Sequence, residues 1–421
     1  MTSEENYPEK HLVRHFDNGL TLIAEQMDWC ESVACAVLVP GGSIYDPTAK
    51  PGLSNLVCEM ALRGAGDYDS HGLIEAFESL GSERGESVGH AHLWFSFATL
   101  ADNLVQTLKL TSEIILNPHF PENQLELGKQ VVLQEILSVE DDPSRKVMIE
   151  LSKNAVPAPW GEPCFGTAEA VESITMEEIR NFHKRYYHPN GAIVSVAGKF
   201  HPDSLVESVS NLFGDWKPNE IQTNKLGPLG KSVLHIPYES AQTHIGLNYP
   251  AVPFRHPDYL LAWSGVSVLS GGMSNRLYTE IREKRGLCYS VGASYYTYRD
   301  FGGVTCYCGT SSDRAQESLD VLLEQLELFS KSGITEKELE LLKIRAKTSL
   351  IMQQESTGSR ASSIARDWHH LGRIRTMSEI EEKINALTVS KINDYLAAHP
   401  PGPYHLVTLG PNPLEMNGKS F

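Results

Sequence analysis

Three polar side chains with the spacing of a metal-binding helix lie in the stretch 52–64. Asn55, Cys58 and Glu59 stand at positions i, i+3 and i+4 of a predicted helix, so their side chains can converge on one point. The opposite side of this helix is apolar and contains Leu53, Leu56, Val57, Met60 and Ala61. A thiolate and a carboxylate bind metal ions, but asparagine is a poor ligand and the stretch contains no histidine. The spacing therefore fits a metal site better than the residue types do.

A second candidate site lies in the stretch 271–291, which begins with two glycines. These glycines do not form a phosphate-binding loop, because no G-K-[ST] sequence follows them. Further along the stretch, Arg282 offers a rigid fork of donors for a carbonyl or a carboxylate, and Tyr289 offers a hydroxyl. The alternative is a surface arginine and a buried tyrosine without a binding role.

Two groups of histidines are also candidates. His90 and His92 are two positions apart in a predicted strand and share a face, which suits either a metal ion or the lining of a groove. Trp368, His369 and His370 lie in a predicted helix. We interpret the first pair as groove-lining residues and the second group as residues that pack inside a domain.

The stretches that position these residues alternate between strands and helices. Strands are predicted at 20–24, 33–39, 90–98 and 192–198. Helices are predicted at 52–64, 70–80, 103–116 and 121–139. A further helix begins after Thr175, where Glu178 completes a capping box. Residues 213–232 lack periodicity and contain several prolines and glycines, which is typical of a linker.

The second half of the sequence repeats the first. The segment around Thr175 is echoed around Thr388 (388 − 175 = 213), and the segment around Leu125 is echoed around Leu339 (339 − 125 = 214). Two pairs with nearly the same offset, about half the chain, indicate an internal duplication. We therefore predict an α+β fold with two homologous domains, each a mixed β-sheet with packed helices. The predicted domains are 1–212 and 233–421, joined by the linker 213–232.

The composition excludes several classes of function. The 421 residues include 36 basic and 53 acidic side chains, and the net charge of −17 argues against nucleic acid or an anionic membrane as a partner. No apolar run reaches the roughly 18 residues of a membrane span, and residues 1–7 resemble neither a secretory signal nor a transit peptide. Seven cysteines without a C-x-x-C pair fit free thiols in a reducing compartment, so we expect a cytoplasmic protein.

The stretch 52–64 resembles the zinc helix of the pitrilysin and mitochondrial processing peptidase family. In that family the inverted motif H-x-x-E-H binds zinc through its two histidines, and its glutamate activates a water molecule. Asn55, Cys58 and Glu59 stand in these three places. The family's third ligand is a glutamate 76 positions after the second histidine, which corresponds to Glu135 (135 − 59 = 76). The resemblance thus implies that Glu135 alone remains of the zinc site.

The resemblance extends over nearly the whole chain, with further matches and losses. Gly128 replaces a second family glutamate, and residues 84–87 replace an N-A-x-T element that pairs with the substrate backbone. The stretch 271–291 closely matches the family's G-G-x-x-S-R-L-x-x-x-I-R-E-x-x-G-L-x-Y-S-V sequence. In the family, the arginine and tyrosine at the positions of Arg282 and Tyr289 bind peptide substrate. The family also implies two similar domains that face each other across a cleft.

This pattern of matches and losses resembles the non-catalytic chain of the family's two-subunit bacterial branch. We expect such a chain to bind peptide substrate and to complete the chamber of a catalytic partner that carries H-x-x-E-H. It would have no catalytic residue or metal of its own, and the zinc is expected in the partner subunit. Two alternatives remain: a structural core-type subunit of a larger complex, and an active metallopeptidase with an atypical site formed by Cys58, Glu59 and Glu135.

Overall fold

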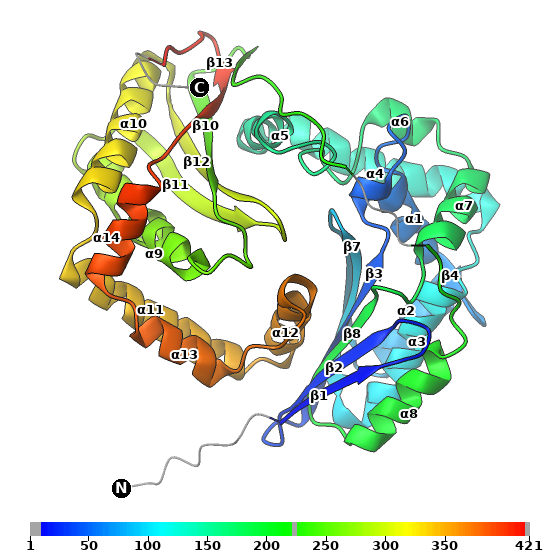
Figure 1. The fold of residues 1–421 in the computed structure, drawn as a ribbon. Coiled ribbons are helices and arrows are strands. Elements are labelled where there is room, and N and C mark those ends of the chain that lie inside the picture. Colours follow the sequence, from blue (N-terminus) through cyan, green and yellow to red (C-terminus); the bar gives the residue numbers. More distant parts are fainter. Residues whose placement is uncertain (1–9, 221–224, 417–421) are drawn as a thin grey trace, which may run out of the picture. The chain divides into compact units, whose positions relative to one another are not determined.

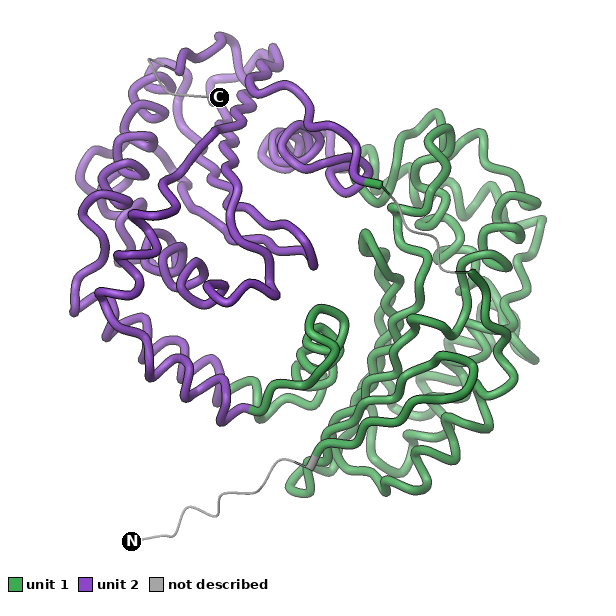
Figure 2. Tube along the Cα trace, viewed as in Figure 1, with its two compact units in different colours: residues 1–137, 163–225, 352–376 green, residues 138–162, 226–351, 377–421 purple. Residues whose placement is uncertain are grey.

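The computed structural model describes residues 10–220 and 225–416, and the chain divides into two compact units (Figure 2). Unit 1 comprises residues 1–137, 163–225 and 352–376, and unit 2 comprises residues 138–162, 226–351 and 377–421. Each unit therefore takes most of its chain from one half of the sequence and a short segment from the other half. The predicted domains 1–212 and 233–421 follow chain order and do not include this exchange.

Unit 1 is built on a six-stranded mixed sheet with the strand order β1-β2-β8-β3-β7-β6 (Figure 1). Its strands are β1 (Lys10–His15), β2 (Thr21–Gln26), β3 (Ser32–Pro40), β6 (Glu83–Val88), β7 (His92–Leu100) and β8 (Ile193–Gly198). β2 and β8 run parallel, and the other neighbouring strands run antiparallel. A short hairpin, β4 (Gly64–Ala65) and β5 (Tyr68–Asp69), pairs separately.

Helices cover both faces of this sheet. One face packs on a large core to which the following helices contribute: α1 (Leu53–Ala61), α2 (Ser70–Ser79), α3 (Leu104–Leu116), α4 (Leu125–Glu140), α6 (Ala168–Glu172), α7 (Met176–Tyr186) and α8 (Pro202–Phe213). The other face is covered by α12 (Thr357–Leu371). Along β3, Val33, Cys35 and Val37 belong to the large core, whereas Ala36 and Leu38 contact the α12 side. Burial of both faces explains why this strand is an unbroken apolar run.

Unit 2 is built on a five-stranded sheet with the order β11-β12-β10-β13-β9 (Figure 1). Its strands are β9 (Val233–Pro237), β10 (Gln242–Ala251), β11 (Cys288–Thr297), β12 (Gly302–Ser311) and β13 (His405–Gly410). Its helices are α5 (Pro143–Ala155), α9 (Tyr259–Ser270), α10 (Ala315–Ser332), α11 (Glu336–Gln354), α13 (Met377–Asn385) and α14 (Val389–Ala398). β9 and β13 run parallel, and the other neighbouring strands run antiparallel.

The two sheets have the same topology. The order β9-β13-β10-β12-β11 of unit 2 repeats the order β2-β8-β3-β7-β6 of unit 1, with the parallel pair in the same place. Each sheet also has one large helix-covered core and one face covered by a single helix from the other half of the chain. The α+β fold with two homologous, duplicated parts is therefore confirmed.

The two exchanged helices are equivalent in the duplication. α5 begins at Pro143 and α12 begins at Thr357, an offset of 357 − 143 = 214 that matches the sequence repeat. α5 comes from the first half but packs on the unit 2 sheet, where its Val147 and Leu151 meet Val407 and Leu409. α12 comes from the second half but packs on β2, β3 and β8 of unit 1. Both helices therefore complete the core of the unit that the other half of the chain mainly forms.

A buried ion pair fixes α12 to the sheet of unit 1. Arg360, of which 1% is exposed, donates from Nε to Glu25 Oε1 at 2.9 Å, and its Nη2 donates to the second carboxylate oxygen. His11 Nε2 lies 3.2 Å from Glu25 Oε2, and Ser195 Oγ donates to the Ala361 carbonyl at 2.6 Å. Because the charged groups are buried, they require each other as partners.

Most predicted elements match the structure, with differences at strand and helix starts. β1 was not predicted, because its sequence K-H-L-V-R-H is too polar to stand out as a strand. The helix predicted at 121–139 begins with a 3₁₀ turn, Glu122–Gln124, before α4. Part of the predicted linker, residues 221–224, lies outside the described residues. In the described part of the chain, no helix combines the length and apolar character needed to cross a membrane.

Candidate functional site

The helix α1 is held at its start by a buried carboxylate. Asp46 accepts hydrogen bonds from the backbone N–H groups of Gly52 and Ser54, each at 2.8 Å, and so caps the helix. Gly52 has a φ of +92°, and a Cβ there would lie 2.5 Å from the Phe165 carbonyl oxygen. Burial raises the pKa of Asp46 to about 7, although the backbone donors oppose this shift. The capping and the apolar face together fix the orientation of the helix.

At the three zinc-motif positions of α1, Asn55 and Glu59 are bonded to neighbouring side chains and Cys58 is buried. Asn55 Nδ2 donates to Glu135 Oε2 at 3.2 Å, so the structure brings together these two predicted site residues. Cys58 is buried, and burial, with the negative charges of Glu86 and Glu59, raises the pKa of its thiol. The thiol therefore stays protonated and suits neither metal binding nor proton abstraction.

Arg63 occupies the side of the motif where Glu59 lies. Its Nη2 and Nε donate to Glu59 Oε1 at 2.7 and 3.1 Å, and its Nη1 donates to Gln124 Oε1 at 3.3 Å. Gly128 packs against the same helix, and a Cβ at that position would lie 2.5 Å from Met60 Sδ, which is too close, and 3.4 Å from Arg63 Nε, which is an ordinary contact. The absence of a side chain at Gly128 therefore makes room for Met60 rather than for Arg63.

These side chains do not fit a zinc ion. Asn55, Cys58 and Glu59 provide one amide, one protonated thiol and one carboxylate that is neutralised by Arg63. On β6, close enough to Cys58 to affect the pKa of its thiol, Arg84 and Glu86 form another ion pair at 2.5 Å. Within residues 10–220 and 225–416, no three His, Cys, Asp or Glu side chains are grouped so that they could hold a metal ion.

His90 and His92 do not form a common site. His90 precedes β7, and its Nδ1 lies 3.3 Å from Ser43 Oγ and 3.8 Å from Cys164 Sγ. The ring of His92 lies on the α12 side, 4.5 Å from the ring of His369. Burial, together with His369 and His370, lowers the pKa of His92 to about 3. His92 is therefore neutral where it packs against the histidines of α12, and we call these three residues the histidine cluster.

In unit 2, Arg282 and Tyr289 lie together. Arg282 belongs to a π-helical turn, Tyr278–Glu283, and its Cζ lies 5.3 Å from the centre of the Tyr289 ring. Tyr289 is the extra residue of a β-bulge, because Cys288 pairs with Thr310 while Ser290 pairs with its neighbour. The bulge leaves 82% of Tyr289 exposed. π-helical turns and β-bulges are both frequent at functional sites.

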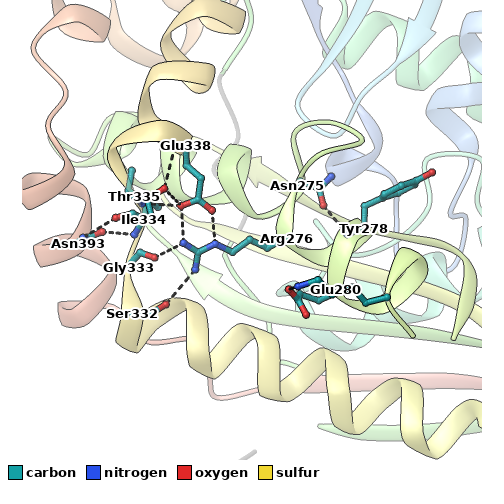
Figure 3. A network of polar contacts seen from close by, with 11 residues as sticks. Asn275, Arg276, Tyr278, Glu280, Ser332, Gly333, Ile334, Thr335, Glu338 and Asn393 are labelled. Carbon is teal, nitrogen blue, oxygen red and sulfur yellow. Dashed lines mark hydrogen bonds and ion pairs between the residues drawn. The ribbon is translucent and has the colours of Figure 1, made fainter. Parts of the chain in front are cut away.

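A polar network anchors the segment that leads into this turn (Figure 3). Arg276 Nε and Nη2 donate to Glu338 at 2.6 and 2.7 Å, and Nη2 also donates to the Gly333 carbonyl at 2.6 Å. Glu338 in turn accepts from the backbone N–H of Thr335 at 2.8 Å, which caps α11. Arg276 and Glu338 also line a surface cavity of about 350 Å³, but the two charges neutralise each other. We therefore interpret the network as structural support for the turn.

Two family models match the chain. The model described as "Insulinase (Peptidase family M16)" matches residues 22–168, and the model described as "Peptidase M16 inactive domain" matches residues 173–345. The chain belongs to peptidase family M16. This is the pitrilysin family that the zinc-helix sequence and the 271–291 stretch resemble, so the family prediction is confirmed.

Individual relatives share both the length and the fold of this M16 chain. "Uncharacterized zinc protease YmxG" of Bacillus subtilis is 29% identical over 378 residues, which are 89% of this chain and 92% of that protein. The crystal structure of a peptidase M16 inactive domain from Pseudomonas fluorescens has a TM-score of 0.88 at 21% identity and covers 96% and 99% of the two chains. A chain of complex III2 from Candida albicans has a TM-score of 0.78 at 18% identity and covers 95% of each chain. At these identities the two structures show the fold alone.

The structure brings two pairs of predicted site residues into contact, and it adds two residues that sequence reasoning missed. Sequence reasoning paired Asn55 with Glu135 and Arg282 with Tyr289, which the structure places in contact. It missed Arg63, although the spacing of four residues from Glu59 on one helix was available as a signal. It also missed Tyr278, which stands four residues before Arg282. The fold brings the Tyr278 hydroxyl within hydrogen-bond distance of Arg282 Nη1.

Proposed function

We propose that this chain is the non-catalytic subunit of a two-chain M16 peptidase, and that it binds the peptide substrate. The proposal rests on one asymmetry. In unit 1, Asn55 bonds to Glu135, Glu59 bonds to Arg63 and Cys58 is buried, whereas in unit 2 Arg282 and Tyr289 lie together at the surface. In this proposal the partner carries H-x-x-E-H and supplies the zinc, the general base and the water.

The chemistry of this chain would then be binding and orientation. The guanidinium of Arg282 and the hydroxyl of Tyr289 can donate hydrogen bonds to a peptide chain and fix it relative to the partner's zinc. The completion of a closed chamber by the two chains, and a cytoplasmic location, remain predictions from the sequence.

Reconstitution with a catalytic M16 chain tests the proposal. Arg282→Ala or Tyr289→Phe should lower kcat/KM of the pair by about tenfold to a hundredfold, because positioning interactions are commonly worth about 1–3 kcal/mol. Arg285→Ala is the matched control, since Arg285 lies on the same segment but pairs with Glu280. Zinc content and association of the pair should not change in any of these variants.

Metal analysis of the isolated chain tests the other half of the proposal. The purified chain should contain no stoichiometric zinc and should cleave no peptide, because its motif side chains do not fit the ion. One zinc per chain, together with cleavage that a chelator abolishes, would favour the atypical metallopeptidase and contradict the proposal.

A structural role in a larger complex is the second candidate. The specific observation in its favour is the similarity in fold to a chain of complex III2 from Candida albicans. In this case the chain would purify from its source with a multi-subunit assembly, and Arg282→Ala would change neither assembly nor activity. Co-purification with one chain of similar size that contains H-x-x-E-H would favour the peptidase subunit instead.

A further inference from the structure

Arg282 is held by a second tyrosine that the comparison with the family does not single out. Its Nη1 donates to the hydroxyl of Tyr278 at 2.9 Å, and its Cζ lies 4.8 Å from the centre of the Tyr278 ring. The ring of Tyr289 lies 5.3 Å from the same Cζ. The guanidinium therefore contacts two aromatic rings, and each contact is a favourable cation–π interaction.

Arg282 differs from the other cationic side chains of its segment in its ion pairing. Arg276 pairs with Glu338, and both Lys284 and Arg285 pair with Glu280. Among the described residues, Arg282 forms no ion pair with an acidic side chain, and its guanidinium donates a hydrogen bond to the neutral hydroxyl of Tyr278. In a chain with 53 acidic and 36 basic residues, a half-buried arginine without an acidic partner is an exception that suits the binding of an anion.

We propose that Tyr278 is a positioning residue that aligns Arg282, and that the aligned guanidinium binds a carboxylate of the peptide substrate. The inference rests on the proposed function and extends it to the substrate class. The carboxylate belongs either to the free C-terminus of the peptide or to an acidic side chain. A planar guanidinium that keeps two parallel N–H donors binds a carboxylate through two hydrogen bonds, which a neutral amide does not match.

The surroundings of Tyr278 explain how it can position Arg282. The backbone N–H of Tyr278 donates to Asn275 Oδ1 at 2.8 Å, and this contact fixes the start of the π-helical turn (Figure 3). Leu277 and Ile281 anchor the turn in the core of unit 2, since both are fully buried. Arginine has many rotamers, so a fixed hydroxyl and ring beside it reduce the entropy that is lost when a ligand binds.

The test measures binding of two kinds of peptide pool, four pools in all, to the purified full-length chain by fluorescence anisotropy. Both are fluorescein-labelled pools of random sequence; one ends in a free carboxylate and the other in an amide, and each is also made without Asp and Glu. The unaltered chain should bind the carboxylate-containing pools more tightly. Arg282→Ala should abolish this preference. Tyr278→Phe should reduce the preference roughly three- to tenfold, because it removes one hydrogen bond but keeps the ring.

Two further variants separate positioning from a loss of structure. Tyr278→Leu removes the hydroxyl and the ring and should reduce the preference for carboxylates more than Tyr278→Phe does. Tyr68→Phe, at an exposed position in unit 1, is the control and should change nothing. If both Tyr278 variants weaken the carboxylate and the amide pools equally, Tyr278 is a structural residue and the inference is wrong.

The remaining outcomes identify the carboxylate and distinguish the two proposals. A preference that persists without Asp and Glu assigns the C-terminal carboxylate, whereas a preference that needs Asp and Glu but not the free end assigns the side chain. Equal binding of all four pools overturns the carboxylate assignment. If Arg282→Ala has no effect on any pool, or if the unaltered chain binds none, the proposed substrate-binding function fails together with the inference. An effect of Arg282→Ala without an effect of either Tyr278 variant overturns the role of Tyr278 alone.

Discussion

At the scale of single residues, Arg63 is the side chain that neutralises the carboxylate at the zinc-motif positions of unit 1. Its guanidinium neutralises Glu59, the residue at the position of the second histidine ligand, and it also reaches Gln124. Removal of the histidines is therefore only part of the change, since the polar groups of the site now satisfy each other. A polar side chain whose hydrogen-bonding groups are already paired destabilises the fold little and does not require a metal ion.

Restoring the zinc motif should therefore not restore tight zinc binding. In the variant Asn55→His, Cys58→Glu, Glu59→His, Arg63 loses its carboxylate partner and its positive charge remains beside the zinc position. Adding Arg63→Gln should raise the zinc affinity by at least about tenfold, since like charges near a protein surface repel by about a few kcal/mol. Competition with a metal chelator measures both affinities. Equal affinities of the triple and quadruple variants would show that Arg63 is unimportant.

Some residues of the two sites could be predicted from the sequence and others could not. Asn55, Cys58 and Glu59 follow from helical spacing, and Glu135 and the Arg282–Tyr289 pair follow from family resemblance. The positions of Arg63 and Tyr278 depend on side-chain rotamers, and those are selected by the surrounding core rather than by local sequence. Gly128 gave no signal by itself, because the meaning of its missing side chain depends on Met60 across the interface of two helices.

At the scale of elements, a buried ion pair contributes to the docking of α12 beside its apolar contacts. Arg360→Met should lower the free energy of unfolding by about 3–5 kcal/mol, because it removes the guanidinium from the buried Glu25 carboxylate, which then keeps its contact with His11. The double variant Glu25→Leu, Arg360→Met should recover part of this loss. Urea unfolding measures the free energies, and hydrogen exchange of α12 localises the effect.

The control for this prediction is an exposed ion pair in the same unit. Lys199 pairs with Glu31 at 2.7 Å, with side chains that are 47% and 82% exposed. Lys199→Met should therefore change the stability by less than about 1 kcal/mol. A loss as small as this for Arg360→Met would contradict the structural importance of the buried pair.

The histidine cluster should make the contact between α12 and the sheet sensitive to acid. The folded-state pKa of His92 is about 3, below the ordinary value of 6.5. The neutral ring therefore stabilises the fold above pH 6.5, and this contribution is lost progressively as the pH falls below 6.5 toward the folded-state pKa. Between about pH 7.5 and about pH 5, the unaltered chain should lose about 2 kcal/mol more stability than His92→Gln.

Urea unfolding at the two pH values checks this prediction. His201→Gln is the control, because the side chain of His201 is exposed. It should show the same pH dependence as the unaltered chain. If His92→Gln also keeps that dependence, the acid sensitivity arises elsewhere and the cluster has no role in it.

Elements were predicted well where hydrophobic periodicity is strong and poorly where it is weak. The strands β2, β3 and β8 have long apolar runs and match the predicted segments. The edge strand β1 has few apolar residues, so only its pairing with β2 makes it a strand. Periodicity shows which side of a helix is buried, but not which sheet it packs against. For this reason the exchange of α5 and α12 could not be predicted.

At the scale of the whole molecule, the duplication and the exchange make each unit depend on both halves of the chain. The repeat was visible in the sequence as two offsets, and the structure adds that one helix per half crosses to the other unit. Without α12, the face of the unit 1 sheet that contains Ile23, Ala36 and Leu38 would be exposed to water. Without α5, Val407 and Leu409 of unit 2 would be exposed in the same way. An exposed apolar face of this kind promotes aggregation.

The two halves of the chain should therefore fold together but not alone. Fragments 1–220 and 225–421, expressed separately, should each aggregate or unfold without cooperativity, because each lacks the helix that covers one face of its sheet. Co-expressed fragments should form a stable one-to-one complex, as measured by light scattering after size-exclusion chromatography. A synthetic peptide of residues 352–376 should increase the solubility of fragment 1–220, whereas the same peptide with Ile364→Asp should not, since Ile364 packs on the sheet. If fragment 1–220 alone is monomeric and unfolds cooperatively, α12 is not needed for unit 1, and the exchange is a feature of the native state without a role in folding.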